Sequence, residues 1–364
     1  MNKCVSKYSF RIFFFLFAII LLFKNRKNRK HDFDQRINTN DYKSSIKHNR
    51  IEDYEPINEE DIVKNSIANK PQPPKDNSFY DHDLAVMILS RRESFKSRKI
   101  IRETWAKNQK NVFFIVGEKS CPIPDNFRKN YYDCQAAVNI STMRNDELIS
   151  YQRQQYEIEL KLKNEPNVVM IPVIDTYANL TRKVKEGIHW MMGNGNPRWL
   201  LKIDDDSVAR LQTLENYLKE NYSDSEYLYM GTMNYKSEVH RQHEKWPELH
   251  YKKGQSNVRY PTYANGCCGY VLSNRIVRYI SDHSDKLFNY HNEDTAIGIW
   301  IEESGFMHKV DYVDEKDRKW FVSEAHSGFF CSDREKFSQY IILGHHLRPS
   351  RIRQCYNVLF NKRH

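Results

Sequence analysis

Three consecutive carboxylates directly follow an apolar run in the segment WLLKIDDDSVARL, residues 199–211. Asp204, Asp205 and Asp206 repel one another, and a buried strand should not end in three acids unless positive charge meets them. A divalent cation such as Mg²⁺ or Mn²⁺ prefers oxygen ligands and commonly bridges carboxylates to phosphates. Because alternate side chains of an extended turn share a side, Asp204 and Asp206 can face one ion while Asp205 faces a sugar or the backbone. A metal site is predicted; the alternative, a helix cap at Asp206 and Ser207, explains only one acid.

Alternating strand-like and helix-like segments must position this site. The strand-like segments are 84–90, 111–117, 167–175, 199–206 and 227–233. The helix-like segments are 94–107, 143–163, 178–192 and 208–220. Strand, helix, strand repeated predicts an α/β fold with a largely parallel sheet covered on both faces. Ligands of such sheets bind beyond the carboxyl ends of the strands, where the three aspartates fall.

A second acidic pair, Glu293 and Asp294, opens the helical pattern EDTAIGIWIEESG. The helix dipole favours acids at this end, which is a sufficient structural explanation for both. The polar, irregular stretch 234–262 has the character of a functional loop.

The charge distribution argues against a nucleic-acid-binding protein. The net charge is +10, but residues 1–50 carry nine of those charges, so the rest of the chain is nearly neutral. Residues 12–23 are uninterrupted apolar sequence. The segment 9–23 would span about 22 Å as a helix, which is short for a bilayer but acceptable for an anchor with snorkelling basic flanks. A cleaved signal peptide is the alternative, yet KNRKNRK follows the run without a small-residue cleavage site.

The predicted organisation is a cytoplasmic tail (1–8), a transmembrane signal anchor (9–23), a flexible stem (24–80) and a lumenal domain (81–364). Basic residues after the anchor would by themselves place the C-terminal part in the cytoplasm. Sequons and cysteines favour the lumen instead. The sequons begin at Asn139, Asn179 and Asn221.

Six cysteines follow the anchor: Cys121, Cys134, Cys267, Cys268, Cys331 and Cys355. Many pairings are compatible with the sequence, and none of the spacings is typical of a zinc site. Disulfides or buried thiols are expected. For the adjacent pair Cys267–Cys268 we expect one or both sulfurs to bond to distant partners rather than to each other.

Six blocks of the sequence occur in the order found in one family of glycosyltransferases. They are RRESFKSRKIIRETWA (91–106), DTYANLTRKV (175–184), LLKIDDDSV (200–208), KWPE (245–248), YPTYANGCCGYVLS (260–273) and NEDTAIGIW (292–300). Over most of residues 84–305 the sequence resembles glycosyltransferase family 31, which includes β-1,3-galactosyltransferases, β-1,3-N-acetylglucosaminyltransferases and the Fringe proteins. The resemblance implies a GT-A (Rossmann-like) domain, a UDP-sugar donor, a Mn²⁺ ion and a type II Golgi membrane protein.

The resemblance also implies roles for individual residues. Asp204 and Asp206 would hold the metal, with Asp206 the most direct ligand and His345 completing the site, or His346 in its place. Asp294, beside Glu293, would be the catalytic base. Donor-binding residues would be Arg98, Arg102, Asp175, Lys183 and Asp205. The acceptor or donor pocket would include Trp246, Tyr263, Gly266 and Gly269.

Each role has a structural alternative. A charged helix surface explains the arginines, solvation explains a helical lysine, and a lone histidine is usually structural. Cys267–Cys268 departs from the family's usual GxGY or GGGY, which puts the shape of the acceptor pocket in doubt. Asn179 belongs to both a family block and a sequon, which makes its glycosylation doubtful.

The function expected from this resemblance is Mn²⁺-dependent, inverting transfer of galactose from a UDP-sugar to a glycan acceptor in β-1,3 linkage. N-acetylglucosamine or N-acetylgalactosamine is the alternative sugar. An alternative of another class is a catalytically silent glycan-binding or chaperone-like relative, which would be expected to lose an acid that this chain keeps. A metal-dependent phosphohydrolase would need a second ligand cluster, which the sequence does not show. The acceptor and the oligomeric state do not follow from the sequence.

Overall fold

The structure is a computed structural model that describes residues 82–136, 143–242, 245–315, 331 and 340–360. The predicted tail, anchor and stem, and the sequon at Asn139, lie outside the described residues. Among the helices that are described, none has the length and apolar character needed to cross a bilayer.

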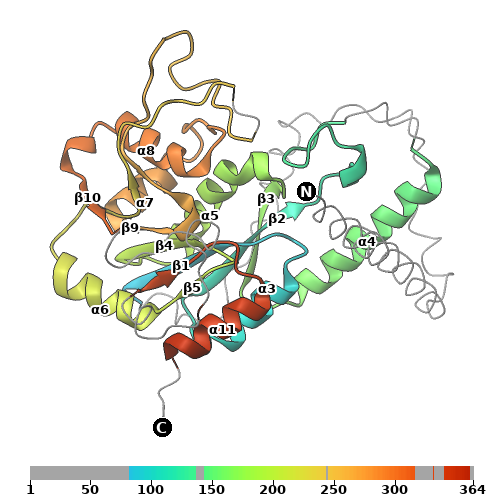
Figure 1. The fold of residues 1–364 in the computed structure, drawn as a ribbon, viewed down its shortest axis with the longest axis horizontal. Helices are drawn as coiled ribbons and strands as arrows, with labels where there is room; N and C mark the ends of the chain where they lie inside the picture. Colours follow the sequence, from blue (N-terminus) through green and yellow to red (C-terminus); the bar gives the residue numbers. More distant parts are fainter. Residues whose placement is uncertain (1–81, 137–142, 243–244, 316–330, 332–339, 361–364) are drawn as a thin grey trace, which may run out of the picture. The chain divides into compact units, whose positions relative to one another are not determined.

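A seven-stranded sheet forms the centre of the domain, in the order β10-β6-β9-β4-β1-β2-β3 (Figure 1). Its strands are β1 (Leu84–Leu89), β2 (Val112–Lys119), β3 (Val168–Ile174), β4 (Trp199–Asp204), β6 (Leu228–Gly231), β9 (Tyr270–Ser273) and β10 (Asp311–Asp314). β9 runs antiparallel to both neighbours, while the other pairs are parallel. The predicted α/β fold with a mostly parallel sheet is therefore confirmed, with one strand reversed.

Helices cover both faces of this sheet (Figure 1). On one face lie α5 (Leu180–Asn194), α7 (Asn274–Asp282) and α8 (Glu293–Glu303). On the other lie α3 (Phe95–Glu103), α6 (Leu211–Tyr222) and α11 (Pro349–Phe360). The long helix α4 (Asn145–Lys163) packs beyond them through a small cluster of Ile158 and Leu162 on Val116.

The sequence of β1, LAVMIL, shows why the strands read as continuous apolar runs. Every residue of the strand is buried. Ala85, Met87 and Leu89 point into one core, and the alternate residues point into the other. Because both faces of this strand are covered, neither face is polar, and apolar residues do not alternate with polar ones along it.

The C-terminal part of the chain returns to the segment that follows the three aspartates. The short strand β11 (Ile342–Leu343) pairs antiparallel with β5 (Val208–Ala209), which directly follows the Asp turn. A disulfide joins Cys331 to Cys355 in α11. Pairing between segments this far apart in sequence was not predicted.

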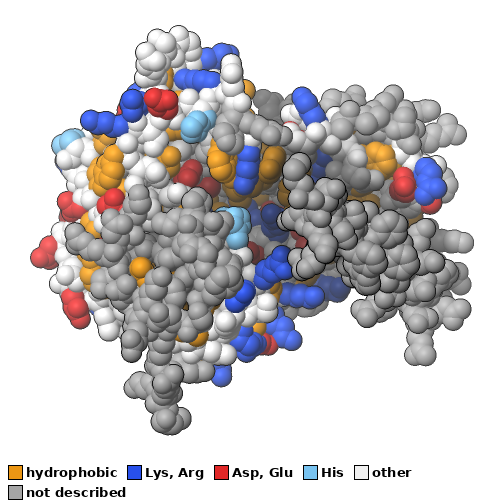
Figure 2. Space-filling view, viewed as in Figure 1, with side chains coloured by type: hydrophobic (Ala, Val, Ile, Leu, Met, Phe, Trp, Pro, Cys, Tyr) orange, Lys and Arg blue, Asp and Glu red, His pale blue; other side chains and the backbone are white. Residues whose placement is uncertain are grey.

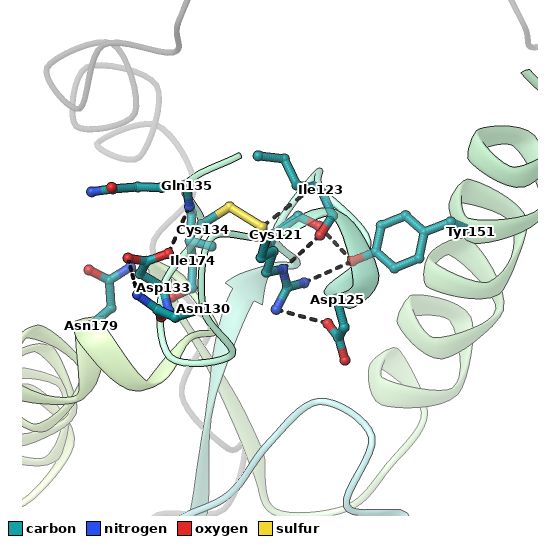
Figure 3. The surroundings of a disulfide bond; sticks show 11 residues. Cys121, Ile123, Asp125, Asn130, Asp133, Cys134, Gln135, Tyr151, Ile174 and Asn179 are labelled. Atoms are coloured by element: carbon teal, nitrogen blue, oxygen red, sulfur yellow. Dashed lines mark hydrogen bonds and ion pairs between the residues drawn. A yellow bond between two sulfur atoms is a disulfide. The ribbon is translucent and has the colours of Figure 1, made fainter. Parts of the chain in front are cut away.

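A second disulfide, Cys121–Cys134, closes the loop that follows β2 (Figure 3). The Tyr151 hydroxyl donates to the Cys121 carbonyl at 2.6 Å, which fastens the loop to α4. Neither Cys267 nor Cys268 takes part in a disulfide. The prediction that they bond to distant cysteines is wrong, because the other four described cysteines pair among themselves.

Two of the predicted glycosylation sequons lie in described residues. Asn179 Nδ2, the atom to which a glycan would attach, donates to the Ile174 carbonyl at 3.1 Å from a half-buried position. Asn221 Nδ2 likewise donates to the Tyr217 carbonyl at 2.8 Å, but this residue is exposed, at the end of α6. The folded structure thus favours Asn221 as the accessible acceptor of the two.

The helix α5 provides a test of how closely helix and sheet pack. It buries Val184, Ile188 and Met191, spaced i, i+4, i+7, against the sheet, with Gly187 between them. A Cβ at Gly187 would lie 2.8 Å from the Met87 sulfur, whereas one at Gly193 of the same helix would meet nothing within 4 Å.

We predict that Gly187→Ala lowers the free energy of unfolding by about 1–2 kcal/mol, because overpacking outweighs the gain in helix propensity. The matched variant Gly193→Ala should raise it by up to about 1 kcal/mol. Urea unfolding of both variants measures the difference. Equal effects of the two substitutions would show that α5 does not pack on β1 as described.

Candidate functional site

A cavity of about 1090 Å³ opens beyond the carboxyl ends of β1 and β4. Its lining includes Ser90 after β1, the three aspartates after β4, the turn Gly266–Cys267 and the start of α8. Figure 2 shows a recess in the middle of the face, with Lys and Arg side chains around it, acidic side chains within it and a histidine at its border. Ligands of parallel sheets bind in this position, so the predicted location of the site is occupied by a cavity.

The three aspartates reach three different partners. Asp204 Oδ1 lies 3.0 Å from the Lys202 ammonium. Asp205 Oδ2 accepts from the Ser90 hydroxyl at 2.6 Å, and burial raises the pKa of Asp205 to about 6. Asp206 points toward the histidines of the C-terminal segment. Mutual repulsion is thus relieved by separate partners.

Asp206, His345 and His346 form a group that could hold a metal ion. One ligand atom from each lies within 4.8 Å of the others. His345 Nδ1 lies 3.3 Å from Asp206 Oδ2 and is a buried nitrogen without a hydrogen-bond partner of acceptable geometry among the described atoms. A carboxylate oxygen suits Mn²⁺, and imidazole nitrogens suit divalent first-row metal ions, so this donor set can accept such an ion without selecting one of them. The residues present therefore fit the implied metal.

The backbone around Asp206 explains how this group is assembled. Pairing of β5 with β11 brings the C-terminal segment alongside the Asp turn. The backbone N–H of His346 then donates to Asp206 Oδ2 at 2.9 Å, and that of Leu347 donates to the Asp206 carbonyl at 3.1 Å. On the opposite side the Trp105 indole donates to the Ser207 carbonyl at 3.0 Å.

Electrostatics favours positive charge beside Asp206. Burial works to lower the pKa of His345, but Asp206 and Asp204 outweigh it and the net shift is upward. Burial conversely works to raise the pKa of Asp206, and His345 brings the net shift below the ordinary value. Asp204, also a predicted ligand, lies outside this group and faces Lys202.

Lys202, in the middle of the buried strand β4, joins the Asp turn to the start of α8. Its ammonium donates to Glu293 Oε1 at 2.6 Å and to the Gly266 carbonyl at 3.3 Å, and it pairs with Asp204. Only 1% of the residue is exposed. All three ammonium hydrogens have acceptors, which is the condition for keeping a charge buried. Two carboxylates hold the pKa of Lys202 above its ordinary range against the opposing effect of burial.

Asp294, the predicted base, lies on the cavity wall at the start of α8. Its Oδ2 accepts from the Gly266 N–H at 3.3 Å and its Oδ1 from the Thr295 N–H at 2.8 Å. Burial raises the pKa of Asp294 although these N–H groups oppose the shift. A carboxylate whose pKa is raised toward the working pH is a better proton acceptor.

Glu293 lies beside Asp294 but faces inward. Its Oε1 takes the Lys202 hydrogen bond and its Oε2 accepts from the Tyr270 hydroxyl at 3.0 Å. Burial raises the pKa of Glu293 to about 7, and Asp294 and Asp204 add to the rise against Lys202. Because Lys202 is shared with Asp204, its charge neutralises Glu293 only in part.

Two of the predicted donor-binding residues form a buried pair at the cavity wall. Lys183 Nζ donates to Asp175 Oδ1 at 2.7 Å and to the Ser90 carbonyl at 2.6 Å. The other oxygen of Asp175 accepts from the Arg92 backbone N–H at 2.8 Å. The pair lines the cavity and holds the chain that follows β1.

The two predicted arginines lie behind the cavity rather than in its described lining. Arg98 is fully buried, binds Glu165 and donates to the Ser90 hydroxyl at 3.0 Å. Ser90 in turn donates to Asp205, so Arg98 reaches the Asp turn through one side chain. Arg102 pairs with Glu165.

The predicted pocket residues Trp246, Tyr263 and Gly266 line the cavity. The Trp246 indole, 41% exposed, donates to the Tyr177 hydroxyl at 2.9 Å. Gly269 supports the pocket from outside its lining: at φ +76°, it packs so that a Cβ would lie 2.4 Å from the Lys202 carbonyl.

Sequence reasoning missed three residues of this site, Lys202, Ser90 and Tyr177. Lys202 carried a signal, since a lysine inside an otherwise apolar strand requires buried acids as partners. Ser90 and Tyr177 carried no comparable signal, because their roles come from which elements the fold brings together.

The fold and the cavity together indicate the structural class of the domain. A mostly parallel α/β sheet with acidic residues and a cavity at its carboxyl edge is the arrangement of Rossmann-like nucleotide-binding domains. A family model described as Galactosyltransferase matches residues 154–312. This match, together with the relatives below, confirms the resemblance to this family that was seen in the six blocks.

Three relatives illustrate the similarity. Human UDP-GalNAc:β-1,3-N-acetylgalactosaminyltransferase 2 is 31% identical over 166 residues, 44% of this chain and 32% of the relative. Mouse β-1,3-galactosyltransferase 6 is 27% identical over 60% of this chain and 59% of the relative. Hydroxyproline O-galactosyltransferase GALT2 of Arabidopsis thaliana is 27% identical over 57% of this chain and 28% of the relative. The chain thus spans about a third of the length of the human relative.

Among solved structures, HddC from Yersinia pseudotuberculosis overlaps 62% of this chain and 99% of its own, at 14% identity and a TM-score of 0.20. The fold is defined by the order and direction of the strands in the sheet.

We predict that Lys202→Met lowers the free energy of unfolding by about 3–5 kcal/mol, because it leaves Glu293 and Asp204 without their buried cation. Lys185→Met is the matched control: this buried lysine of α5 donates to the Leu287 carbonyl at 2.8 Å, away from the cavity. Its loss should cost about 1–3 kcal/mol. Denaturant unfolding compares them, and an equal or smaller loss for Lys202→Met would contradict the network.

A second prediction concerns pH. The pKa of Glu293 is raised from 4.5 to about 7, so the folded state binds more protons than the unfolded state in this window. Stability from this group is therefore present at low pH and lost as the pH rises toward 7. Between about pH 5 and about pH 8, without metal, the wild type should lose up to about 3 kcal/mol relative to Glu293→Gln. Parallel pH profiles of unfolding for the two proteins would contradict the raised pKa.

Proposed function

We propose that this chain is a metal-dependent, inverting glycosyltransferase that moves a hexose from a UDP-sugar to a glycan hydroxyl in β-1,3 linkage. The observation that carries the proposal is one cavity lined by both a metal-capable Asp206–His345 group and the half-buried carboxylate of Asp294. Galactose is the proposed sugar. N-acetylgalactosamine is the second candidate, because relatives from several vertebrates are named for it.

Asp206 and His345, with His346 beside them, would hold the metal ion. When bound, Mn²⁺ would supply positive charge to the departing diphosphate, the hardest part of moving a sugar from a nucleotide. Asp204 lies outside this metal-binding group and stays paired with the ammonium of Lys202. Asp205, held by Ser90, is proposed to face the donor.

Asp294 accepts the proton of the acceptor hydroxyl as that oxygen attacks the anomeric carbon. Two backbone N–H groups orient the carboxylate, and burial raises its pKa, which makes it a better proton acceptor. Because the acceptor oxygen attacks from the side opposite UDP, the configuration at the anomeric carbon is inverted. The exposed indole of Trp246 offers an apolar face to a sugar ring at the same cavity.

The proposed setting is the Golgi membrane, with residues 9–23 as the anchor, 24–80 as the stem and the catalytic domain in the lumen. The apolar run of residues 12–23 and the polar composition after it support this arrangement. Two disulfides in the described residues suit an oxidising compartment.

The test is release of UDP from a panel of UDP-sugars with a set of glycan acceptors, with Mn²⁺ and then with a chelator. We expect turnover of one donor that requires the metal. Asp206→Asn should weaken metal-dependent UDP binding, and Asp294→Asn should retain UDP binding and lose turnover by about 100-fold or more. Asp224→Asn, an exposed acid after α6, is the matched control and should behave as wild type.

The outcomes separate the alternatives. Tight UDP binding without turnover across the acceptors would instead support a catalytically silent, glycan-binding relative. Absence of UDP binding would reject the assignment of the aspartates. Full activity of Asp294→Asn would reject its role as the base.

A further inference from the structure

Two cysteines that are not disulfide-bonded lie side by side at the cavity. Cys267 and Cys268 belong to a single 3₁₀ turn, Gly266–Cys268, between β8 (Tyr263–Ala264) and β9. Their sulfur atoms are 3.3 Å apart. Cys267 is half-buried and lines the cavity, whereas Cys268 is fully buried beneath it. One thiol is therefore reachable from the cavity, and the second can be reached only through the first.

The same turn contacts both halves of the site. The Gly266 N–H donates to Asp294, and the Gly266 carbonyl accepts from Lys202. On the metal side, a Cβ at Gly344, the residue before His345, would lie 3.0 Å from the Cys267 carbonyl. A change in the shape of this turn would thus reach the base and the histidine together.

The turn has little room to absorb such a change. The Asn265 side chain accepts from the Cys267 N–H at 3.2 Å at its start, and the Gly269 N–H donates to the Gly266 carbonyl at 3.2 Å at its end. Gly269 also packs directly on the Lys202 carbonyl. Movement of the two sulfurs must be taken up by Gly266 and the cysteines themselves.

We propose that Cys267 and Cys268 form a thiol–disulfide modification site that takes low-molecular-weight disulfides, such as glutathione disulfide, and controls the catalytic site. The Cys267 thiolate attacks one sulfur of the disulfide RSSR; the S–S bond breaks, and RS⁻ leaves and takes up the proton that Cys267 released. The Cys268 thiol, losing its proton, then attacks the Cys267 sulfur and expels a second RSH. In total RSSR is reduced to two RSH, and the two cysteines are oxidised to one disulfide.

The product would be strained and therefore reversible. Disulfides usually join residues whose Cα atoms are about 4.4–6.8 Å apart, whereas Cα atoms of neighbouring residues are only about 3.8 Å apart. Strained disulfides are more easily reduced, as a regulatory bond requires. Drawing the sulfurs together displaces Gly266 from Asp294 and Lys202. The effect on turnover rests on the proposed function, whereas the thiol chemistry does not.

The test is incubation of the full chain with mixtures of oxidised and reduced glutathione, followed by mass spectrometry of the peptide that carries both cysteines. In the wild type we expect loss of two hydrogen atoms without a retained glutathionyl group, reversed by reduced glutathione. Cys268→Ala should stop at one glutathionyl group on Cys267. Cys267→Ser should remain unmodified, because Cys268 is fully buried.

Two further measurements report whether the turn Gly266–Cys268 has been displaced. Amide hydrogen exchange at Gly266 should be faster in the oxidised wild type, whether or not a donor sugar is known. Turnover of the oxidised wild type, relative to its reduced form, should fall by about 100-fold, as expected for a misplaced base, and should recover on reduction.

The outcomes are distinguishable. Unmodified wild-type thiols, a glutathionyl group that persists on wild-type Cys267, or equal reactivity of Cys267→Ser would each overturn the site. Unchanged Gly266 exchange or full turnover after oxidation would overturn the control of catalysis. If no UDP-sugar is turned over at all, the proposed function fails, while the mass and exchange measurements still decide the thiol site.

Discussion

The buried ammonium of Lys202 is the interaction on which the rest of the site depends. A strand covered on both faces cannot end in acids unless a cation lies nearby, and here the cation comes from the same strand. Lys202 meets Asp204 from the Asp turn and Glu293 from α8, and it also binds the Gly266 carbonyl. Three segments far apart in sequence are therefore fixed relative to one another by one charge.

The second constraint is the return of the chain to the Asp turn. β5 begins two residues after Asp206, and its pairing with β11 places the two histidines beside that carboxylate. The disulfide Cys331–Cys355 holds part of the same C-terminal region. The metal-capable group thus forms at a junction of backbone pairing, where its geometry is set by the fold rather than by flexible side chains.

Between these constraints lies the turn that carries Gly266, Cys267 and Cys268. It is bonded to the predicted base on one side and packs against the residue before His345 on the other. A family motif expected to contain small residues here contains two thiols instead. A departure at this position changes the chemistry of the cavity wall without removing any acid of the proposed mechanism.

The sequence by itself determined the α/β class, the strands β1 to β4 and the position of the acids, because apolar runs buried on two faces and charges at their ends are local patterns. It also determined which residues resemble a known family. It did not reveal the reversed β9, the β5–β11 pairing, the partners of Lys202 or the absence of a disulfide at Cys267 and Cys268. Those depend on which distant segments meet, and only the tertiary structure decides that, since contacts between distant segments leave no periodic pattern in the chain.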